Sequence, residues 1–89
     1  MLRIQQSGKR QVVFKLSGRM DAQNAAELKT MIEAAKDGRP ITLDLIDVTL
    51  VDRDAVRFLE RCEAANITLK NCPLYIREWI TREREATNS

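Results

Sequence analysis

Two periodicities alternate along this chain, and their order restricts the fold to one sheet with covering helices. Apolar and polar residues alternate in four short segments, residues 2–5, 12–16, 41–45 and 67–70. A period of two is typical of strands that bury one face. The segments between and after them place apolar residues three and four positions apart, which is the helical period. The sequence therefore predicts an α/β fold with the order β-β-α-β-α-β-α in a single domain, residues 1–89.

End signals set the bounds of the three predicted helices. Asp21 is the predicted N-cap of a helix over about 22–36, which stops before Gly38. A second helix is predicted over about 53–65, and a third begins at Pro73, which suits the first helical position. The apolar stripes of the three helices are Ala25, Leu28, Met31, Ile32 and Ala35; Ala55, Val56, Phe58, Leu59, Cys62 and Ala65; and Tyr75, Ile76, Trp79 and Ile80.

The connections between these elements predict how the sheet is built. A turn at Gly8 joins the first two strands as a hairpin, and Gly18 is predicted to end the second strand. Strand-helix-strand repeats imply parallel strands with right-handed crossovers. Because the strands alternate, we expect all helices on one face and a solvated second face. Residues 47–52 are predicted as a connection, and residues 86–89 as a frayed tail. The residues expected on the open face are Gln11, Val13, Lys15, Thr42, Asp44, Thr68 and Lys70.

Composition excludes several classes of function. The chain has no histidine, which removes Ser-His-Asp triads, Cys-His nucleophiles and histidine metal sites. Its two cysteines are too few for a disulfide scaffold or a four-thiolate zinc site. A net charge of +2 and four aromatic residues argue against nucleic-acid binding. No apolar run approaches the roughly 20 residues of a membrane span. We therefore expect a reduced, cytoplasmic domain that binds neither nucleic acid nor membrane.

Four carboxylates follow one another around the third strand and the start of the second helix. They are Asp44, Asp47, Asp52 and Asp54. Aspartate is favoured in turns and at helix N-termini, and this structural explanation is preferred. Two alternatives stay open. The first is a small-ligand or nucleotide sensor that uses the Asp52 loop and the helix start. The second is a magnesium-dependent enzyme that uses Asp44, Asp47 and Asp52.

The two cysteines do not indicate a catalytic centre. Cys62 lies in the middle of a helical apolar stripe, so it is predicted to be a small buried hydrophobe. Cys72 lies between a strand and a helix start, where a thiolate could be stabilised, but no catalytic partner accompanies it. No catalytic residue, cofactor or metal ligand is predicted. The residues favour a binding module over an enzyme.

Two motifs at this spacing resemble the STAS domain of sulphate transporters and anti-sigma factor antagonists. The first, Leu16–Asp21, has the pattern apolar-x-Gly-x-apolar-Asp, and the second covers Ile41–Asp52. The resemblance extends over about residues 10–80 and implies a fold of strand-helix units, in agreement with the one-sided sheet. The family motif positions in this chain are Gly18, Asp21, Asp44 and Asp52.

The resemblance also implies a function, with one departure. In antagonist members a phosphorylatable serine follows the aspartate that matches Asp52, whereas Arg53 and then Asp54 stand here. Thr49 is the nearest hydroxyl. The resemblance therefore implies a small regulatory module that binds a protein partner, such as an anti-sigma factor or a related kinase. Without the serine, we expect constitutive binding with no phosphorylation switch.

The predicted partner surface lies at the start of the second helix. Its helical phase leaves Arg57, Glu60 and Arg61 opposite the apolar stripe. Family members usually continue into a further strand and helix, so the sheet edge near residues 67–70 is expected to be open, like the edge near residues 3–5. Open edges predict self-association or strand pairing with a partner. The full set of predicted partner-binding residues is Asp52, Arg53, Asp54, Arg57, Glu60 and Arg61.

Overall fold

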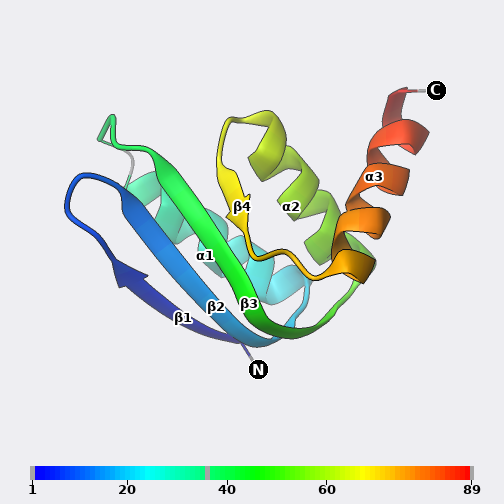
Figure 1. The fold of residues 1–89 in the computed structure, drawn as a ribbon, viewed down its shortest axis with the longest axis horizontal. Coiled ribbons are helices and arrows are strands. Elements are labelled where there is room, and N and C mark those ends of the chain that lie inside the picture. The colour runs from blue at the N-terminus through cyan, green and yellow to red at the C-terminus, as the bar shows by residue number, and fades with distance from the viewer. Residues whose placement is uncertain (1, 36, 89) are drawn as a thin grey trace.

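The structure, a computed structural model, describes residues 2–35 and 37–88 as one four-stranded sheet with three helices (Figure 1). The sheet order is β1-β2-β3-β4, with β1 antiparallel to β2 and the other two pairings parallel. The predicted order of elements is confirmed. The bounds are β1 Leu2–Ser7, β2 Val12–Met20, α1 Ala22–Ala35, β3 Ile41–Val51, α2 Arg53–Ala64, β4 Thr68–Lys70 and α3 Leu74–Asn88.

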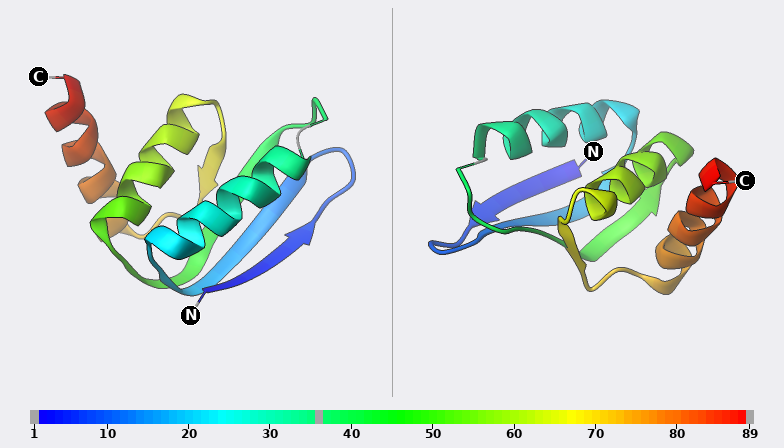
Figure 2. Two further views of the ribbon diagram at one scale, coloured as in Figure 1. Left: turned by 180° about the vertical axis from the view of Figure 1, so that it is seen from behind. Right: turned by 90° about the horizontal axis from the view of Figure 1, so that it is seen from above.

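The two faces of the sheet differ. Helices α1 and α2 cover one face, as the views from behind and above show (Figure 2). Figure 1 looks onto the other face, on which no helix of the described residues lies. There Lys15, Asp44 and Lys70 stand in register on three neighbouring strands. Helix α3 lies beside α2, past the β4 edge, and packs mainly on α2. None of the helices in the described residues is long and apolar enough to cross a bilayer.

The hydrophobic core lies between the sheet and the helices. It draws on the alternate residues of the two central strands and on one stripe of each helix, as the two periodicities predict. Burying a side chain of this size contributes about 1.5–3 kcal/mol. The largest fully buried side chains are Phe14, Leu16 and Met20 of β2, Leu43 and Leu45 of β3, Leu28 of α1, Leu59 of α2, and Ile76 and Ile80 of α3.

Strand β3 is longer than predicted: of residues 47–52, predicted as a connection, residues 47–51 belong to the strand, and Asp52 alone lies between β3 and α2. The strand has eleven residues where β2 has nine, and their register shifts twice. Each shift inserts an extra residue into β3, as in a β-bulge. The burial pattern shows the first shift, because Ile46 and Asp47 are both exposed between the buried Leu45 and Val48. This break in the alternation made a continuous strand look like a strand followed by a loop.

Strand β2 also passes the position where it was predicted to end. Gly18 lies inside the strand with φ +97°, a conformation that residues with a Cβ adopt at a cost, and β2 continues to Met20. The second register shift against β3 falls between Gly18 and Arg19. The glycine therefore accommodates an irregularity within the sheet instead of ending the strand.

The third helix differs from its prediction at both ends. Tyr75, predicted on the inner stripe, is 46% exposed, and its hydroxyl donates to the Thr49 carbonyl oxygen at 2.8 Å. Trp79 is partly buried. At the other end, residues 86–88, predicted as a frayed tail, are helical. Lys36 and Ser89, which the predictions placed in a helix and in the tail, lie outside the described residues.

Candidate partner-binding surface

Helix α2 begins at a capped and well-anchored turn. Asp52 has an extended backbone, φ −102° and ψ 179°, and its Oδ1 accepts a hydrogen bond from the Ala55 amide at 2.8 Å. The Asp52 amide in turn donates to the Met20 carbonyl at 3.3 Å, which ties the end of β3 to the end of β2. Loss of such a cap costs about 1 kcal/mol. The exposed charges that follow Asp52 are therefore presented on a fixed helix start.

Helix α1 begins in the same way beside it. The Asn24 backbone amide donates to Asp21 Oδ1 at 2.9 Å, and the Asp21 backbone amide donates to Asn24 Oδ1 at 3.2 Å. Asp21 is therefore the N-cap of α1, as predicted. A hollow of about 340 Å³ lies between the two helix starts. Each N-terminus already holds its own carboxylate, which disfavours a phosphate there. The residues that line the hollow are Arg19, Met20, Asp21, Leu50, Val51 and Asp52.

One side of α2 is tied to α3 by ion pairs. Glu83 bridges two arginines of α2: its Oε1 lies 3.2 Å from Arg53 Nε and its Oε2 lies 3.5 Å from Arg57 Nε. Burial alone would raise the pKa of Glu83, but Arg53, the Trp79 side chain and Arg57 together hold this pKa below its ordinary value. Glu60 pairs with Arg84 at 3.6 Å. Three predicted partner-binding residues therefore have ion-pair partners within the chain.

The same contact continues one turn further along α2. Glu63 Oε1 accepts from Arg77 Nη1 at 2.8 Å and also from Arg84 Nη2. These hydrogen bonds and charges, first that of Arg77 and then that of Arg84, hold the pKa of Glu63 below its usual range. Because Arg84 also reaches Glu60, the carboxylates of α2 and the guanidinium groups of α3 form one network.

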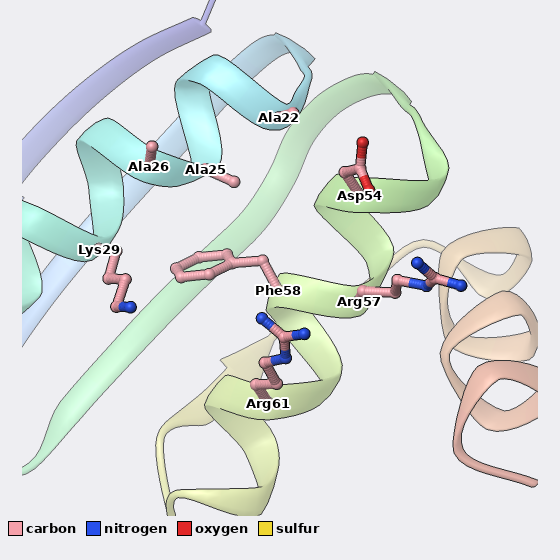
Figure 3. A pocket seen from close by; sticks show the side chains of 8 residues that line it. All are labelled: Ala22, Ala25, Ala26, Lys29, Asp54, Arg57, Phe58 and Arg61. Carbon is pink, nitrogen blue, oxygen red and sulfur yellow. The ribbon is translucent and has the colours of Figure 1, made fainter. Parts of the chain in front are cut away.

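The opposite side of α2 faces α1 across an open groove. The Phe58 ring points from α2 into the space between the helices, toward Ala25 and Lys29 of α1 (Figure 3). The side chain of Arg57 points the other way, toward α3, in agreement with its ion pair (Figure 3). The part of the groove nearer to the starts of α1 and α2 has a volume of about 230 Å³. It is lined by Ala22, Ala25, Ala26, Lys29, Asp54, Arg57, Phe58 and Arg61.

The structure thus divides the predicted partner-binding residues between two sides of one helix. Arg53, Arg57 and Glu60 form ion pairs with α3, whereas Asp54 and Arg61 line the groove toward α1. Arg61 also lines a hollow on the α3 side, together with Arg57, Glu60 and Glu83. All six are at least partly exposed. Three residues that belong to these surfaces were missed from the sequence, namely Lys29, Phe58 and Glu83. Phe58 was assigned to the core because its helical phase is right, and only the spacing between α1 and α2 leaves it partly open.

The four aspartates are not gathered into one site. Asp44 accepts from the Ile46 amide at 3.1 Å and from Asn71 Nδ2 at 3.2 Å, and Asp47 lies 3.8 Å from Lys15 Nζ. Within residues 2–35 and 37–88, no group of three or more His, Cys, Asp or Glu residues could hold a metal ion. The structure therefore does not bring Asp44, Asp47 and Asp52 together as the enzyme alternative requires.

Both cysteines are free thiols. Cys62 is buried in α2, as predicted, and burial raises its pKa to about 12. Burial also raises the pKa of the partly buried Cys72, an effect larger than that of the nearby Arg77 charge, which lowers it. The helix start near Cys72 therefore does not produce the low-pKa thiol that a nucleophile needs.

Comparison with known proteins agrees with this architecture. Residues 3–78 match the family described as Mlab, STAS domain. The chain belongs to the STAS domain family. No curated protein sequence matches this STAS domain.

Solved structures of several proteins share the fold of this STAS domain, and three of them are compared in detail. The anti-sigma factor antagonist SpoIIAA, in its unphosphorylated form, is 19% identical with a TM-score of 0.68, and the match covers 99% of this chain and 96% of SpoIIAA. A protein of the DUF3478 family from Shewanella loihica, described as having a SpoIIAA-like fold, is 14% identical with a TM-score of 0.58, over 97% of this chain and 78% of the other.

The third structure, Mglu, is 19% identical with a TM-score of 0.59. The match covers 80% of this STAS domain but 19% of Mglu, so the likeness concerns one part of that larger chain. At these identities the three structures show a common fold, and the function of this domain has to be argued from its own surface.

Proposed function

We propose that this STAS domain is a regulatory module that binds a protein partner through the start of α2. The observation that carries the proposal is the exposed sequence Asp52-Arg53-Asp54 on a capped helix start. A rigid, charged loop-to-helix junction is a typical place for recognition. The partner class, an anti-sigma factor or a related kinase, is supported by the family and by the fold shared with SpoIIAA.

We further propose that binding is constitutive. Arg53 occupies the position that the resemblance gives to a phosphorylatable serine, and it is paired with Glu83. Phosphorylation would add about −1.5 to −2 charges at pH 7, whereas Arg53 carries a positive charge. Asp54, one position later, supplies a single fixed negative charge. In residues 49–57 Thr49 is the one hydroxyl side chain, and its carbonyl is held by Tyr75.

The domain is proposed to act without catalysis, in a reducing compartment such as the cytoplasm. Its two thiols are free and have raised pKa values, and in the described residues its acidic side chains form no metal cluster. A nucleotide sensor at the hollow between the helix starts is not favoured, because Asp21 and Asp52 already fill the N-terminal anion positions. We expect ATP with Mg²⁺ to leave the melting temperature unchanged.

The test begins with identification of the partner, by affinity purification of the tagged domain from its native cell and mass spectrometry. Affinity for that purified partner is then compared among wild type, Asp54→Lys and Arg82→Glu. Arg82 lies on the exposed side of α3, so its reversal is the matched control. We expect Asp54→Lys to weaken binding about tenfold or more and the control to have little effect.

Arg53 needs a second design because its reversal also breaks the ion pair with Glu83. The variant Glu83→Gln removes the same ion pair and leaves Arg53 in place, so it is the control for Arg53→Glu. If the partner reads Arg53, Arg53→Glu binds weakly, whereas Glu83→Gln binds as wild type does. Unchanged affinity in both Asp54→Lys and Arg53→Glu, or phosphorylation of Thr49 by the partner, contradicts the proposal.

A further inference from the structure

The α1 wall of the groove between α1 and α2 is partly apolar, because α1 contributes alanines to it. Ala22, Ala25 and Ala26 leave room in front of Phe58 (Figure 3). A second hollow of about 160 Å³ continues the groove along α2 and is more apolar, with Ile32 and Ile67 in its lining. The two hollows share Lys29, Phe58 and Arg61, so these three residues mark the middle of one continuous groove.

The charges of the groove are arranged around that midpoint. Lys29 stands on the α1 wall and Arg61 on the α2 wall, and both are exposed. Within the described residues neither of them has an ion-pair partner, in contrast to Arg57, which pairs with Glu83. Among the residues that line the two hollows, the carboxylates are Asp54 at one end and Glu33 at the other, while Glu60 and Glu83 lie on the α3 side of Arg61. The middle of the groove is therefore an aromatic side chain between two free cations.

We propose that this groove docks an acidic amphipathic helix of the partner protein. An apolar side chain of that helix packs on Phe58, and carboxylates on either side of it meet Lys29 and Arg61. Helices in apolar grooves are a recurrent mode of recognition, read by anchors three and four residues apart. The proposal names the chemistry of the partner and so rests on the proposed function; the groove and the α2 start meet at Asp54.

Other occupants fit the groove less well. Sites for whole small molecules bury most of the ligand surface, whereas this groove is open to solvent, and its two hollows of about 230 and 160 Å³ each suit single side chains. A nucleic acid backbone needs a continuous basic stripe, and Asp54 and Glu33 interrupt the positive charge at both ends. The two cations Lys29 and Arg61, one on each wall beside Phe58, match a short acidic segment with an apolar centre.

The probe for this proposal is a synthetic peptide helix with leucines along one face and glutamates along both margins of that face. Its matched control carries lysines in place of the glutamates. Backbone amide shifts of the isotope-labelled domain report where each peptide binds. We expect the acidic peptide to shift α1 and α2 residues that line the groove, with an affinity that falls as salt is added, and the basic peptide to bind much more weakly.

Variants locate the contact. Lys29→Glu and Arg61→Glu should each weaken the acidic peptide about tenfold or more, because they place like charges together, and Arg82→Glu should leave it unchanged. Phe58→Ala should abolish saturable binding while the domain stays folded. The double variant Lys29→Glu with Arg61→Glu should instead accept the basic peptide, which a misfolded protein could not do.

The proposal is overturned if the acidic peptide does not bind, if both peptides bind equally, or if the shifts lie at the α2 start instead of the groove. The last result would leave the proposed function standing, since that surface is tested with the native partner by Arg53→Glu, and Arg53 lines neither hollow of the groove. Conversely, peptide binding in the groove combined with native affinity that does not change in Arg53→Glu would retain the groove and reject the proposed surface.

Discussion

Helix α2 carries charged residues on two sides, which differ in whether these residues form ion pairs within the domain. Toward α3, its arginines and glutamates are paired with Glu83, Arg77 and Arg84. Toward α1, Arg61 is without an ion-pair partner among the described residues and lines a groove with Lys29 and Phe58. One helix thus uses similar side chains to hold the domain together on one side and to face solvent on the other. The difference shows that a run of exposed charges on a helix is assigned a role by the neighbouring element, not by its own sequence.

The largest effect should come from the third side of α2, the one that faces the sheet. Leu59 is fully buried, and Leu59→Ala should lower the free energy of unfolding by about 2–5 kcal/mol through lost burial and a cavity. Urea unfolding followed by circular dichroism measures it. Phe58→Ala, one residue along and partly open, is the control and should cost clearly less. Equal losses would mean that the groove is not open in solution.

Cys62 tests the buried side of α2 at a second position, where the side chain is buried beneath the second hollow of the groove. Cys62→Ala should cost about 1–2 kcal/mol in the same urea measurement, as a small core truncation. In a Cys72→Ala variant, where Cys62 is the one remaining thiol, labelling with a thiol reagent at pH 8 should be slow, because burial raises the Cys62 pKa to about 12. Labelling as fast as that of a free thiol, without unfolding, would show that the helix phase is wrong.

A smaller loss is expected on the α3 side. Glu63→Gln should lower the free energy of unfolding by about 1 kcal/mol, since exposed ion pairs contribute little each and this one belongs to a network. The folded-state pKa of Glu63 is depressed, so its contribution is full above the ordinary value of 4.5 and is lost as pH falls through the folded-state value. The variant should therefore lose less stability than wild type when pH is lowered. Parallel pH profiles would contradict the network.

The smallest effect is expected from the cations of the groove. Lys29→Gln and Arg61→Gln should each change the free energy of unfolding by less than about 0.5 kcal/mol, because neither side chain has an ion pair to lose in the described structure. Differential scanning calorimetry measures both, with Arg57→Gln as the comparison that does lose its pair with Glu83. Losses as large as that of Glu63→Gln would erase the distinction between the two sides of α2.

The sequence predicted the framework of this fold well because the framework depends on local periodicity. The helices predicted over about 22–36 and 53–65, which the structure has over 22–35 and 53–64, the cap at Asp21 and the burial of Cys62 all follow from patterns within about ten residues. The same reliance on local patterns made the prediction end strand β3 too early. Its bulges depend on the register with β2, a long-range property that leaves only a broken alternation in the sequence.

The candidate surface was less predictable because it depends on contacts between distant segments. Arg53 and Glu83 are 30 residues apart, and nothing in either neighbourhood indicates that they meet. Tyr75 was placed in the core by its spacing to Trp79, but the position of α3 beside α2 turns its hydroxyl to the Thr49 carbonyl. Lys29 is a candidate binding residue only because α1 and α2 form the two walls of one groove, which the sequence does not indicate.

The hydrogen bond from Tyr75 to Thr49 connects α3 to the chain just before the start of α2. The two residues belong to the first turn of α3 and to the irregular end of β3, three residues before the cap at Asp52. Glu83, two turns further along α3, holds Arg53 immediately after that cap. Helix α3 therefore contacts the chain on both sides of Asp52. A displacement of α3 would break contacts on both sides of Asp52, at Thr49 and at Arg53, and so alter the geometry of the α2 start.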